Sequence, residues 1–477
     1  MLLPESRGVA LILLLAAFVL PATAQDVKLK KVAQETVAAD RDTLSAETLD
    51  EEVEFQEMPD SAVVDSLLPW PLYMTHRIDR TMQTSPYMKG VQAGVVIYDL
   101  TADSLLYNYE GSRLLKPASN MKLFSSITAL KELGAAREFK TRLYLSGEIR
   151  QDTIYLVPDS VRLDIPLEEL NDSLGKPLYV FKKVLHGNMY GVGGYDPMFS
   201  TAELNRMADV IKDLQVDSIA GDFLEDEHFR YMATVAPLQV NKEGNFMGKL
   251  KTALQRRGIS CPGEVGTGRC SEDTVLVAYG SHTLRQIMNR MMKQSDNQYA
   301  EDVYQHVNAV TAPVHAVKRL IKELGFNPDT YTFGDGSGLS HSTRVSAELE
   351  VALLRYARAH EPIYIPLYET LPIAGVDGTL GSRMKDGTAY RNVRAKTGTI
   401  NGVITLAGYC RSANGHELAF AILLNEITSQ ITAKALEDEL CTIMTHDETM
   451  IPKKKVITVK RRAARRRRPV ARPRKKR

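Results

Sequence analysis

The stretch KPASNMKLFSSITALKELG, from Lys116 to Gly134, decides how the rest of the chain is interpreted. A proline near its start and a glycine at its end are helix boundary signals, so the sequence predicts one amphipathic helix here. At 100° per residue, the large apolar side chains fall within about 60° of one mean direction. Three polar side chains, Ser119, Lys122 and Ser126, share that apolar side. The polar face lies elsewhere and carries Asn120, Ser125, Thr128, Lys131 and Glu132.

A serine and a lysine one turn apart on the buried side of a helix can be a nucleophile and its base. Burial disfavours the charged form of a lysine and lowers its pKa, so its amine can take the proton of a neighbouring hydroxyl. Ser119 also lies in the first turn, where the helix dipole favours developing negative charge. We therefore expect Ser119 to be the nucleophile and Lys122 its base. A lysine whose amine simply reaches solvent would give the same spacing.

Two further motifs support this interpretation. Ser295-Asp296-Asn297 lies between two predicted helices and offers a second hydroxyl, which can relay a proton, and an amide, which can hold a peptide group. Lys396-Thr397-Gly398-Thr399 lies on a predicted edge strand, where glycine permits close approach by a substrate backbone. Each motif alone is also an ordinary turn or strand end. In this order, S-x-x-K, S-x-N and K-T-G are typical of penicillin-recognising serine acyl enzymes, and they predict acyl transfer through a covalent serine.

The sequence patterns near the start and the end of the predicted ordered region, which begins near Leu67, indicate strands of a single sheet. GVVIYDL (94–100) and LLYNYE (105–110) read as a hairpin, and VRAKTGT, VITLAGYC and HELAFAILLNE read as a three-stranded meander whose first turn is Asn401-Gly402. A helix follows near Ser429–Met444. The sequence thus predicts a mixed α/β (α+β) fold, an antiparallel sheet covered by helices. Between its halves lies a predicted inserted α+β domain with one helix near Thr201–Leu214, and two helices flank the SDN triplet.

Composition separates the termini from the body of the 477-residue chain, which is 44% hydrophobic and 25% charged. The first residues carry an apolar run and an A-x-A site, which predict a secretory signal peptide, and an uncleaved anchor is the alternative. Residues 25–66 hold 12 acids and 4 bases and predict a flexible linker. Of the 60 Lys and Arg residues, 15 lie in Ile451–Arg477, which leaves 45 basic against 58 acidic residues in the rest of the chain. The sequence predicts an exported protein with a disordered basic tail.

Four cysteines allow three pairings in an oxidising compartment. Cys261 and Cys270 flank a glycine-rich loop, so a local disulfide is one expectation, and Cys410 and Cys441 complete the set. No metal-ligand spacing occurs, and we expect no metal and no cofactor.

The motifs and the 176-residue separation of Ser119 from Ser295 resemble the D-alanyl-D-alanine carboxypeptidase/endopeptidase family, the class C low-molecular-mass penicillin-binding proteins. PASNMKL, GVGGYDPMF, GDFLEDEHF, DGSGLSHSTRVS and LPIAGVDGTLGSR are similar to stretches of that family. The resemblance implies a penicillin-binding/β-lactamase-like transpeptidase domain with an insertion. The expected segments are a signal peptide (1–24), a linker (25–66), the acyl-enzyme domain (67–146 and 281–448), the inserted domain (147–280) and the basic tail (449–477).

The resemblance also implies roles for the site residues. Ser295 would pass a proton to the leaving amine, and Asn297 would bind substrate backbone. Lys396 would stabilise negative charge, while Thr397 and Thr399 would engage the terminal carboxylate, with Gly398 between them. The backbone N–H groups of Ser119 and Thr399 would form the oxyanion hole.

Peptidoglycan peptides are the implied substrates, and β-lactams the implied covalent inhibitors, in the periplasm or the extracellular envelope. A β-lactamase or esterase on the same scaffold and a non-catalytic wall-binding protein are the alternatives. The basic composition of the tail indicates either electrostatic attachment to anionic envelope polymers or a solvated extension without a partner. Because the protein is expected to be exported, nucleic acid is not an expected partner.

Overall fold

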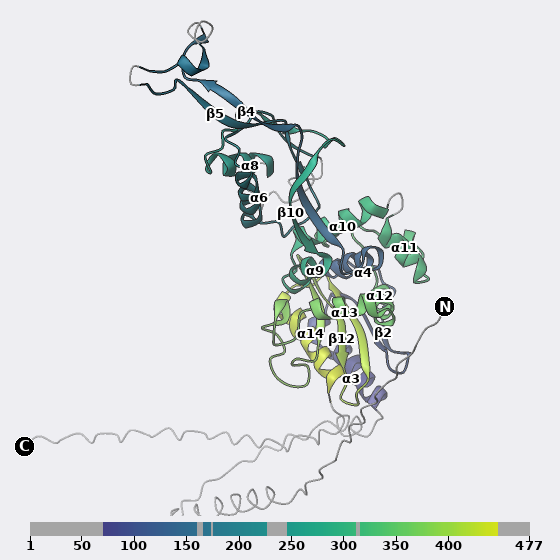
Figure 1. The fold of residues 1–477 in the computed structure, drawn as a ribbon. Coiled ribbons are helices and arrows are strands. Elements are labelled where there is room, and N and C mark those ends of the chain that lie inside the picture. Colours follow the sequence, from purple (N-terminus) through teal and green to yellow (C-terminus); the bar gives the residue numbers. More distant parts are fainter. Residues whose placement is uncertain (1–69, 160–165, 173–174, 227–245, 312–314, 447–477) are drawn as a thin grey trace, which may run out of the picture. The chain divides into compact units, whose positions relative to one another are not determined.

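The computed structural model describes residues 70–159, 166–172, 175–226, 246–311 and 315–446. Its main sheet has five antiparallel strands in the order β11-β12-β13-β1-β2, so the first and last parts of the chain build one sheet, as the sequence predicts (Figure 1). The strands are β1 (Gln92–Asp99), β2 (Ser104–Tyr109), β11 (Arg394–Ile400), β12 (Val403–Arg411) and β13 (Glu417–Asn425).

The predicted hairpins are confirmed by the strand register. β1 and β2 pair over the turn at residues 100–103, and β11 and β12 pair from Ile400 with Val403 outward. The two-residue turn between them is Asn401-Gly402, and Gly402 has φ +71°, a left-handed conformation that glycine adopts without strain. β11 lies at the sheet edge, as predicted, which leaves one side of its backbone unpaired along most of its length.

Helices cover both faces of the main sheet. Side chains alternate along β12, so that Ala407 and Tyr409 pack with one set of helices while Leu406 and Cys410 pack with the other. The first set is α4 (Met121–Leu133), α9 (Leu284–Lys293), α10 (Asn297–Thr311), α11 (Ala316–Glu323), α12 (Ala347–Ala359) and α13 (Glu361–Thr370). The second set is α3 (Trp70–Thr84) and α14 (Gln430–Thr445). Short 3₁₀ turns are η1 (Pro86–Met88), η2 (Ala118–Asn120), η3 (Leu167–Glu169), η4 (Pro328–Thr330) and η5 (Gly378–Leu380).

The helix predicted from Pro117 to Gly134 is present, but it begins as the 3₁₀ turn η2 and continues as α4. Gly134 ends it with φ +78°. The predicted exposed polar face is wrong for the first ten residues of α4, because every residue from Met121 to Leu130 is buried. Helices α9 to α13 pack around α4. Its polar side chains are therefore interior groups: Ser125 donates to the Gly336 carbonyl at 2.7 Å.

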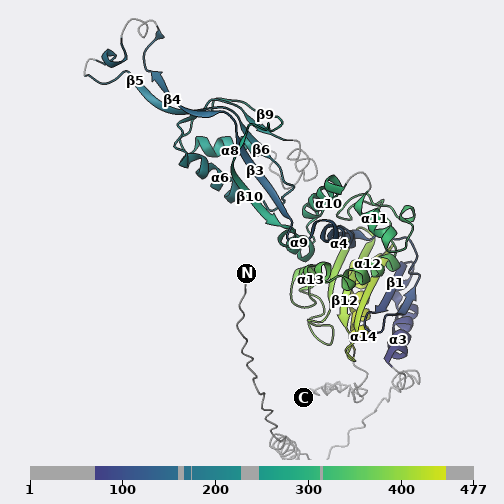
Figure 2. The same ribbon diagram turned by 45° about the vertical axis from the view of Figure 1, so that its right-hand side comes forward.

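Two further sheets lie between α4 and α9 in the chain (Figure 2). One has the order β10-β3-β6-β8-β9 and the other β4-β5-β7. Their strands are β3 (Glu138–Leu145), β4 (Glu148–Tyr155), β5 (Tyr179–His186), β6 (Met189–Val192), β7 (Ser218–Ile219), β8 (Phe223–Glu225), β9 (Val265–Thr267) and β10 (Val275–Thr283). The predicted helix near Thr201 is α6 (Thr201–Asp213), begun by a capping box of Ser200 and Glu203.

The expectation of a single helix in this region is wrong, because α8 (Phe246–Gln255) packs beside α6 in one apolar cluster. The domain boundaries at 147 and 280 stay a prediction. All four cysteines are free thiols, so the expected local disulfide is not formed. Cys261 is buried in the cluster with α6 and α8, whereas the thiol of Cys270 contacts Thr274 Oγ1 at 3.2 Å.

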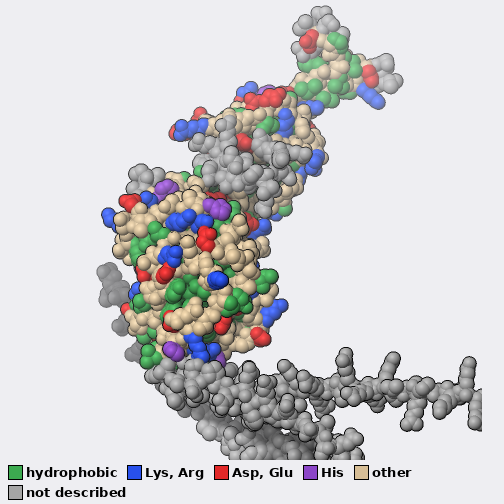
Figure 3. All heavy atoms as spheres, turned by 180° about the vertical axis from the view of Figure 1, so that it is seen from behind, with side chains coloured by type: hydrophobic (Ala, Val, Ile, Leu, Met, Phe, Trp, Pro, Cys, Tyr) green, Lys and Arg blue, Asp and Glu red, His purple; other side chains and the backbone are tan. Residues whose placement is uncertain are grey.

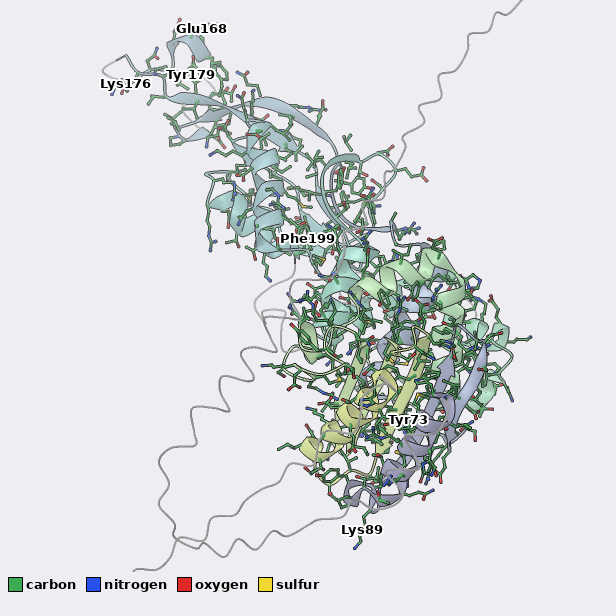
Figure 4. The ribbon with its side chains drawn as sticks, turned by 90° about the horizontal axis from the view of Figure 1, so that it is seen from below. Tyr73, Lys89, Glu168, Lys176, Tyr179 and Phe199 are labelled. Carbon is green, nitrogen blue, oxygen red and sulfur yellow. The ribbon has the colours of Figure 1, made fainter. Side chains whose placement is uncertain are left out.

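The ribbon of β4 and β5 exposes hydrophobic side chains (Figure 3). They are Ile149, Ile154, Leu156, Val180 and Phe181. Tyr179, at the start of β5, packs edge-on against Phe181 with ring centroids 5.4 Å apart (Figure 4). Among the described strands, only the two-residue β7 extends this ribbon.

The predicted signal peptide, acidic linker and basic tail lie outside the described residues and stay predictions. Within the described ranges, no helix combines the length and the apolarity that crossing a membrane requires.

Candidate active site

The candidate nucleophile and base lie at the start of α4. Ser119, in η2, is partly exposed, whereas Lys122 is fully buried. Lys122 Nζ lies 3.0 Å from Ser119 Oγ, 2.7 Å from Asn297 Oδ1 and 2.8 Å from the Ser337 carbonyl oxygen. When Lys122 is neutral, its amine has two N–H donors and one lone pair, so it can donate to the two carbonyl oxygens and accept from the serine hydroxyl. The three contacts therefore place the lone pair of the neutral form where it can take the Ser119 proton.

Burial favours the neutral form of Lys122. It lowers the pKa of Lys122 to about 7, against the charges of Glu301, Asp335 and Asp296, which favour the protonated amine. The pKa of Lys396 is lowered well below its usual range, first by burial and then by the nearby charge of Lys122. Both candidate site lysines thus lie in an interior that resists charge.

The SDN triplet brings a second serine to a lysine. Ser295 has φ +58° in the short connection between α9 and α10. Its hydroxyl accepts from Lys396 Nζ at 2.9 Å. Asp296 caps α10, because its carboxylate accepts from the backbone N–H groups of Gln298 and Tyr299, and it pairs with Arg290 at 3.0 Å. This cap holds the triplet in place and leaves Asp296 a structural role.

Strand β11 presents the KTGT residues along a free edge. The N–H of Ala395 points away from β12, since it donates to the Pro372 carbonyl at 3.1 Å. N–H groups of alternate residues point the same way in an antiparallel strand, so those of Thr397 and Thr399 also face outward. The Thr397 hydroxyl donates to Thr379 Oγ1 at 2.6 Å, and Thr399 is exposed. An extended peptide could pair with this edge.

Gly398 has a different neighbour from the one that the sequence suggested. A Cβ at this position would lie 2.0 Å from Thr405 Oγ1 and 2.8 Å from the Pro117 carbonyl oxygen. Thr405 itself donates to that carbonyl at 2.8 Å, which ties β12 to the turn that carries Ser119. The glycine therefore allows η2 to pack directly on the sheet.

A loop that contacts Lys122 lies in the stretch DGSGLSHSTRVS, which resembles the family but to which the sequence assigned no role. In DGSG, residues 335–338, the Ser337 carbonyl meets the amine while Asp335 accepts from the N–H groups of Gly338 and Ser340. Glu301, on α10, accepts from the N–H groups of Gly336 and Ser337 at 2.8–3.1 Å. No sequence motif links Glu301 to this loop, which begins more than 30 positions further along the chain. Only the fold reveals that the two are in contact.

Replacing Glu301 with glutamine should move the acid limb of the acylation pH profile to lower pH. Glu301 makes the largest single contribution that favours protonated Lys122, so removing its charge lowers the pKa of the amine below about 7. The neutral fraction of Lys122 then rises at pH 6. The measurement is the second-order rate of penicillin acylation between pH 5 and 9. Glu348→Gln, at a partly exposed carboxylate on α12, is the control, and an unshifted limb in Glu301→Gln would contradict the assignment.

A second buried carboxyl supports the residue next to the nucleophile. Asn120 Nδ2 donates to Glu350 Oε2 at 2.9 Å, and both side chains are fully buried. Burial raises the pKa of Glu350 to about 8, so this carboxyl is protonated at neutral pH. The remaining oxygens of the pair, Asn120 Oδ1 and Glu350 Oε1, have no other hydrogen-bond partner among the described residues. A protonated Glu350 can therefore donate back to Asn120.

Glu350→Gln should stabilise the protein increasingly as pH rises. Above about pH 4.5 the unfolded chain loses the Glu350 proton while the folded protein keeps it up to about pH 8. Wild-type stability therefore falls across that window, by on the order of a few kcal/mol. Glutamine keeps the pair with Asn120 and does not titrate. Thermal unfolding of both proteins at pH 5 and pH 8 measures the effect, and a melting-temperature difference that is equal at the two pH values would refute it.

Within the described parts of the chain, no group of three or more His, Cys, Asp or Glu side chains is placed to hold a metal ion. The candidate groups for chemistry are Ser119, Lys122, Ser295, Asn297 and Lys396, which the fold brings together from α4, the α9–α10 connection, the start of α10 and β11. Two serine–lysine pairs beside a free strand edge define a serine acyl-transfer enzyme of the penicillin-binding class.

Comparison with known proteins supports that class. Residues 74–157 and 232–446 match the D-Ala-D-Ala carboxypeptidase 3 (S13) family, and the chain belongs to this family. It is similar to a D-alanyl-D-alanine carboxypeptidase of Actinomadura sp. (strain R39), with 28% identity over 71% of this chain and 79% of that protein.

Two solved structures share the fold. Penicillin-binding protein 4 (dacB) of Haemophilus influenzae, complexed with a β-lactam, aligns with a TM-score of 0.60 and 21% identity over 78% of this chain and 100% of that one. A peptidoglycan endopeptidase of Bdellovibrio bacteriovorus aligns with a TM-score of 0.51 and 16% identity over 74% and 92%. The fold class predicted from the sequence is therefore confirmed.

Proposed function

We propose that the protein hydrolyses D-Ala-D-Ala termini and D-alanyl cross-bridges of peptidoglycan through an acyl-enzyme on Ser119. The observation that carries the proposal is the 3.0 Å contact between Ser119 Oγ and the buried amine of Lys122 inside a member of this family. The names of its relatives point to the same substrate class.

In the first step, Lys122 takes the hydroxyl proton while Ser119 Oγ attacks the carbonyl carbon of the substrate. The outward N–H of Thr399 and that of Ser119 donate to the oxyanion that forms. Asn297 uses Oδ1 to accept from Lys122, which leaves its Nδ2 to donate to a substrate carbonyl. Thr397 and Thr399 bind the terminal carboxylate beside Lys396.

Collapse of the intermediate breaks the C–N bond, and the leaving amine needs a proton. Ser295 supplies it and is resupplied by the proton that Lys122 has taken, while Lys396, at 2.9 Å, orients the Ser295 hydroxyl. A water molecule then attacks the acyl-enzyme ester, and Ser119 regains its hydroxyl proton as the product acid leaves. β-Lactams would acylate the same serine, and the related penicillin-binding protein 4 was solved with one bound.

The test is digestion of purified muropeptides followed by mass measurement. Loss of one alanine from pentapeptides indicates carboxypeptidase action, and conversion of cross-linked dimers to monomers indicates endopeptidase action. No product from either substrate, with rapid turnover of a β-lactam instead, would favour a β-lactamase and contradict the proposal.

We also propose that the protein acts in the periplasm or outer envelope after export, where its basic tail binds anionic envelope polymers. The support is the charge of Ile451–Arg477, 15 basic residues and no acid. Removal of Lys453–Arg477 should weaken salt-sensitive retention on purified sacculi. Unchanged retention would refute attachment through the tail.

A further inference from the structure

A pocket of about 490 Å³ lies at the end of the main sheet where β12 turns into β13, beside α13. None of the proposed catalytic residues lines it. The residues that matter for its chemistry are Tyr364, Tyr368, Arg391, Arg394, Arg411 and Glu417. We propose that this pocket is a second, non-catalytic binding site for a carboxylate or phosphate group attached to a small planar or apolar body.

Positive charge in the pocket exceeds negative charge. Among the described residues, Glu417 is the one acidic residue in the lining, and it already pairs with Arg358 at 2.8 Å and with Arg411 at 3.1 Å. Neither Arg391 nor Arg394 has an acidic partner within 4 Å among the described residues. Arg391 and Arg394 therefore line the pocket without a described carboxylate beside them to neutralise their charge.

The guanidinium of one of these arginines and the backbone of the other are held in place. The guanidinium of Arg394 stacks over the ring of Tyr368 at 4.6 Å, and Arg394 begins β11, where its backbone is fixed by pairing with Tyr409. Asn392 exchanges hydrogen bonds with the backbone of Arg411 at 2.7 and 2.8 Å and so fixes the loop next to Arg391. Arg391 itself has φ +60°, a strained conformation for a non-glycine residue. The guanidinium of Arg394 would therefore need little further ordering when a ligand binds.

The chemistry of the lining selects an oxyanion. A guanidinium presents a planar fork of N–H donors that matches carboxylate and phosphate oxygens in pairs, and a partly buried cation gains most from an anionic partner. The rings of Tyr364 and Tyr368, 5.1 Å apart, give an aromatic wall for the rest of the ligand. The volume suits a small molecule or a few residues of peptide.

The pocket and the catalytic centre lie on one strand but are separate. Arg394 and Lys396 are two residues apart on β11 and on the same face, about 7 Å along the strand. The proposed site thus goes beyond the hydrolytic function and does not depend on Ser119. An anion held there could come from a peptide carboxylate or from a phosphate of an envelope polymer.

The test is isothermal titration at constant ionic strength of the whole protein pretreated with benzylpenicillin, which occupies the catalytic serine. Citrate is the carboxylate probe, inorganic phosphate the phosphate probe and acetamide the neutral control. We expect saturable binding of one or both anions, weakened at least tenfold in Arg391→Gln/Arg394→Gln. Arg355→Gln is the matched control, because this arginine also stacks on a tyrosine, Tyr98 at 3.7 Å, but has an acidic partner in Asp103 at 3.2 Å.

The probe that binds identifies the source, citrate pointing to peptide carboxylates and phosphate to phosphorylated polymers. Equal binding by wild type and the double variant, or no saturable binding of either anion, would overturn the proposal. Circular dichroism and thermal unfolding check that the double variant is folded. If it is not, the single variant Arg391→Gln, at an exposed side chain, carries the same test with the same two outcomes.

Discussion

Ser119→Ala is expected to abolish covalent labelling by a fluorescent penicillin and all release of D-Ala from pentapeptides. The substitution removes the only atom that can form the acyl bond in the proposed reaction, and it leaves Lys122 with its contacts to Asn297 and Ser337. The fold should be retained, since Ser119 is partly exposed and the change deletes one hydroxyl. Gel fluorescence after incubation with the label measures the loss.

Ser126→Ala is the matched control for that experiment. Ser126 lies on the same side of the same helix, two turns further on, where it is fully buried and its hydroxyl contacts Met292 Sδ at 3.3 Å. Its variant should label like wild type. Labelling of Ser119→Ala at the wild-type level would contradict the proposed mechanism.

Lys122→Met should reduce the acylation rate at least about a thousandfold at pH 8, because the base that takes the Ser119 proton is lost. Methionine fills much of the same buried volume, although Asn297 Oδ1 and the Ser337 carbonyl lose their donor, at about 1–3 kcal/mol each. The residual rate should also lose its rise through pH 7, since that rise reports the pKa of Lys122. Stopped-flow acylation across pH 5–9 measures both effects.

Lys131→Met controls for the loss of a lysine from α4. Lys131 lies in the last turn of the helix, partly exposed, and pairs with Glu323 at 3.0 Å. It should acylate at the wild-type rate with the wild-type pH dependence. A Lys122→Met protein that still acylates with a limb near pH 7 would show that another group is the base.

The main sheet and the residues of the three motifs could be predicted from the sequence because each depends on local signals. Asn401-Gly402 fixes a hairpin, Ser429 caps α14 and side-chain alternation follows the strands. These signals operate over a few residues. They were enough to predict a sheet built from both ends of the chain.

The surroundings of α4 could not be predicted in the same way. Asn120, Ser125 and Thr128 look like a solvent-facing side in a helical projection, but distant helices bury them. Glu301, Glu350 and the DGSG loop are joined to one another or to the site by hydrogen bonds that span 35 to 230 positions in the chain. The periodicity of apolar residues depends only on residues close together in the sequence. It therefore cannot reveal which polar side chains from distant segments are buried together in the interior.

The complete burial of the first turns of α4 has a consequence for residues that never touch a substrate. Lys122 can act as a base near neutral pH only while burial keeps its amine desolvated and its pKa low. Phe124 and Met292 are among the fully buried side chains packed in the same core, and a smaller side chain at such a position would open space that bulk solvent could enter. Hydration would restore the charge on the amine. Catalytic competence in this protein is therefore a property of the whole helical layer, and it can decline through lost packing while the fold itself persists.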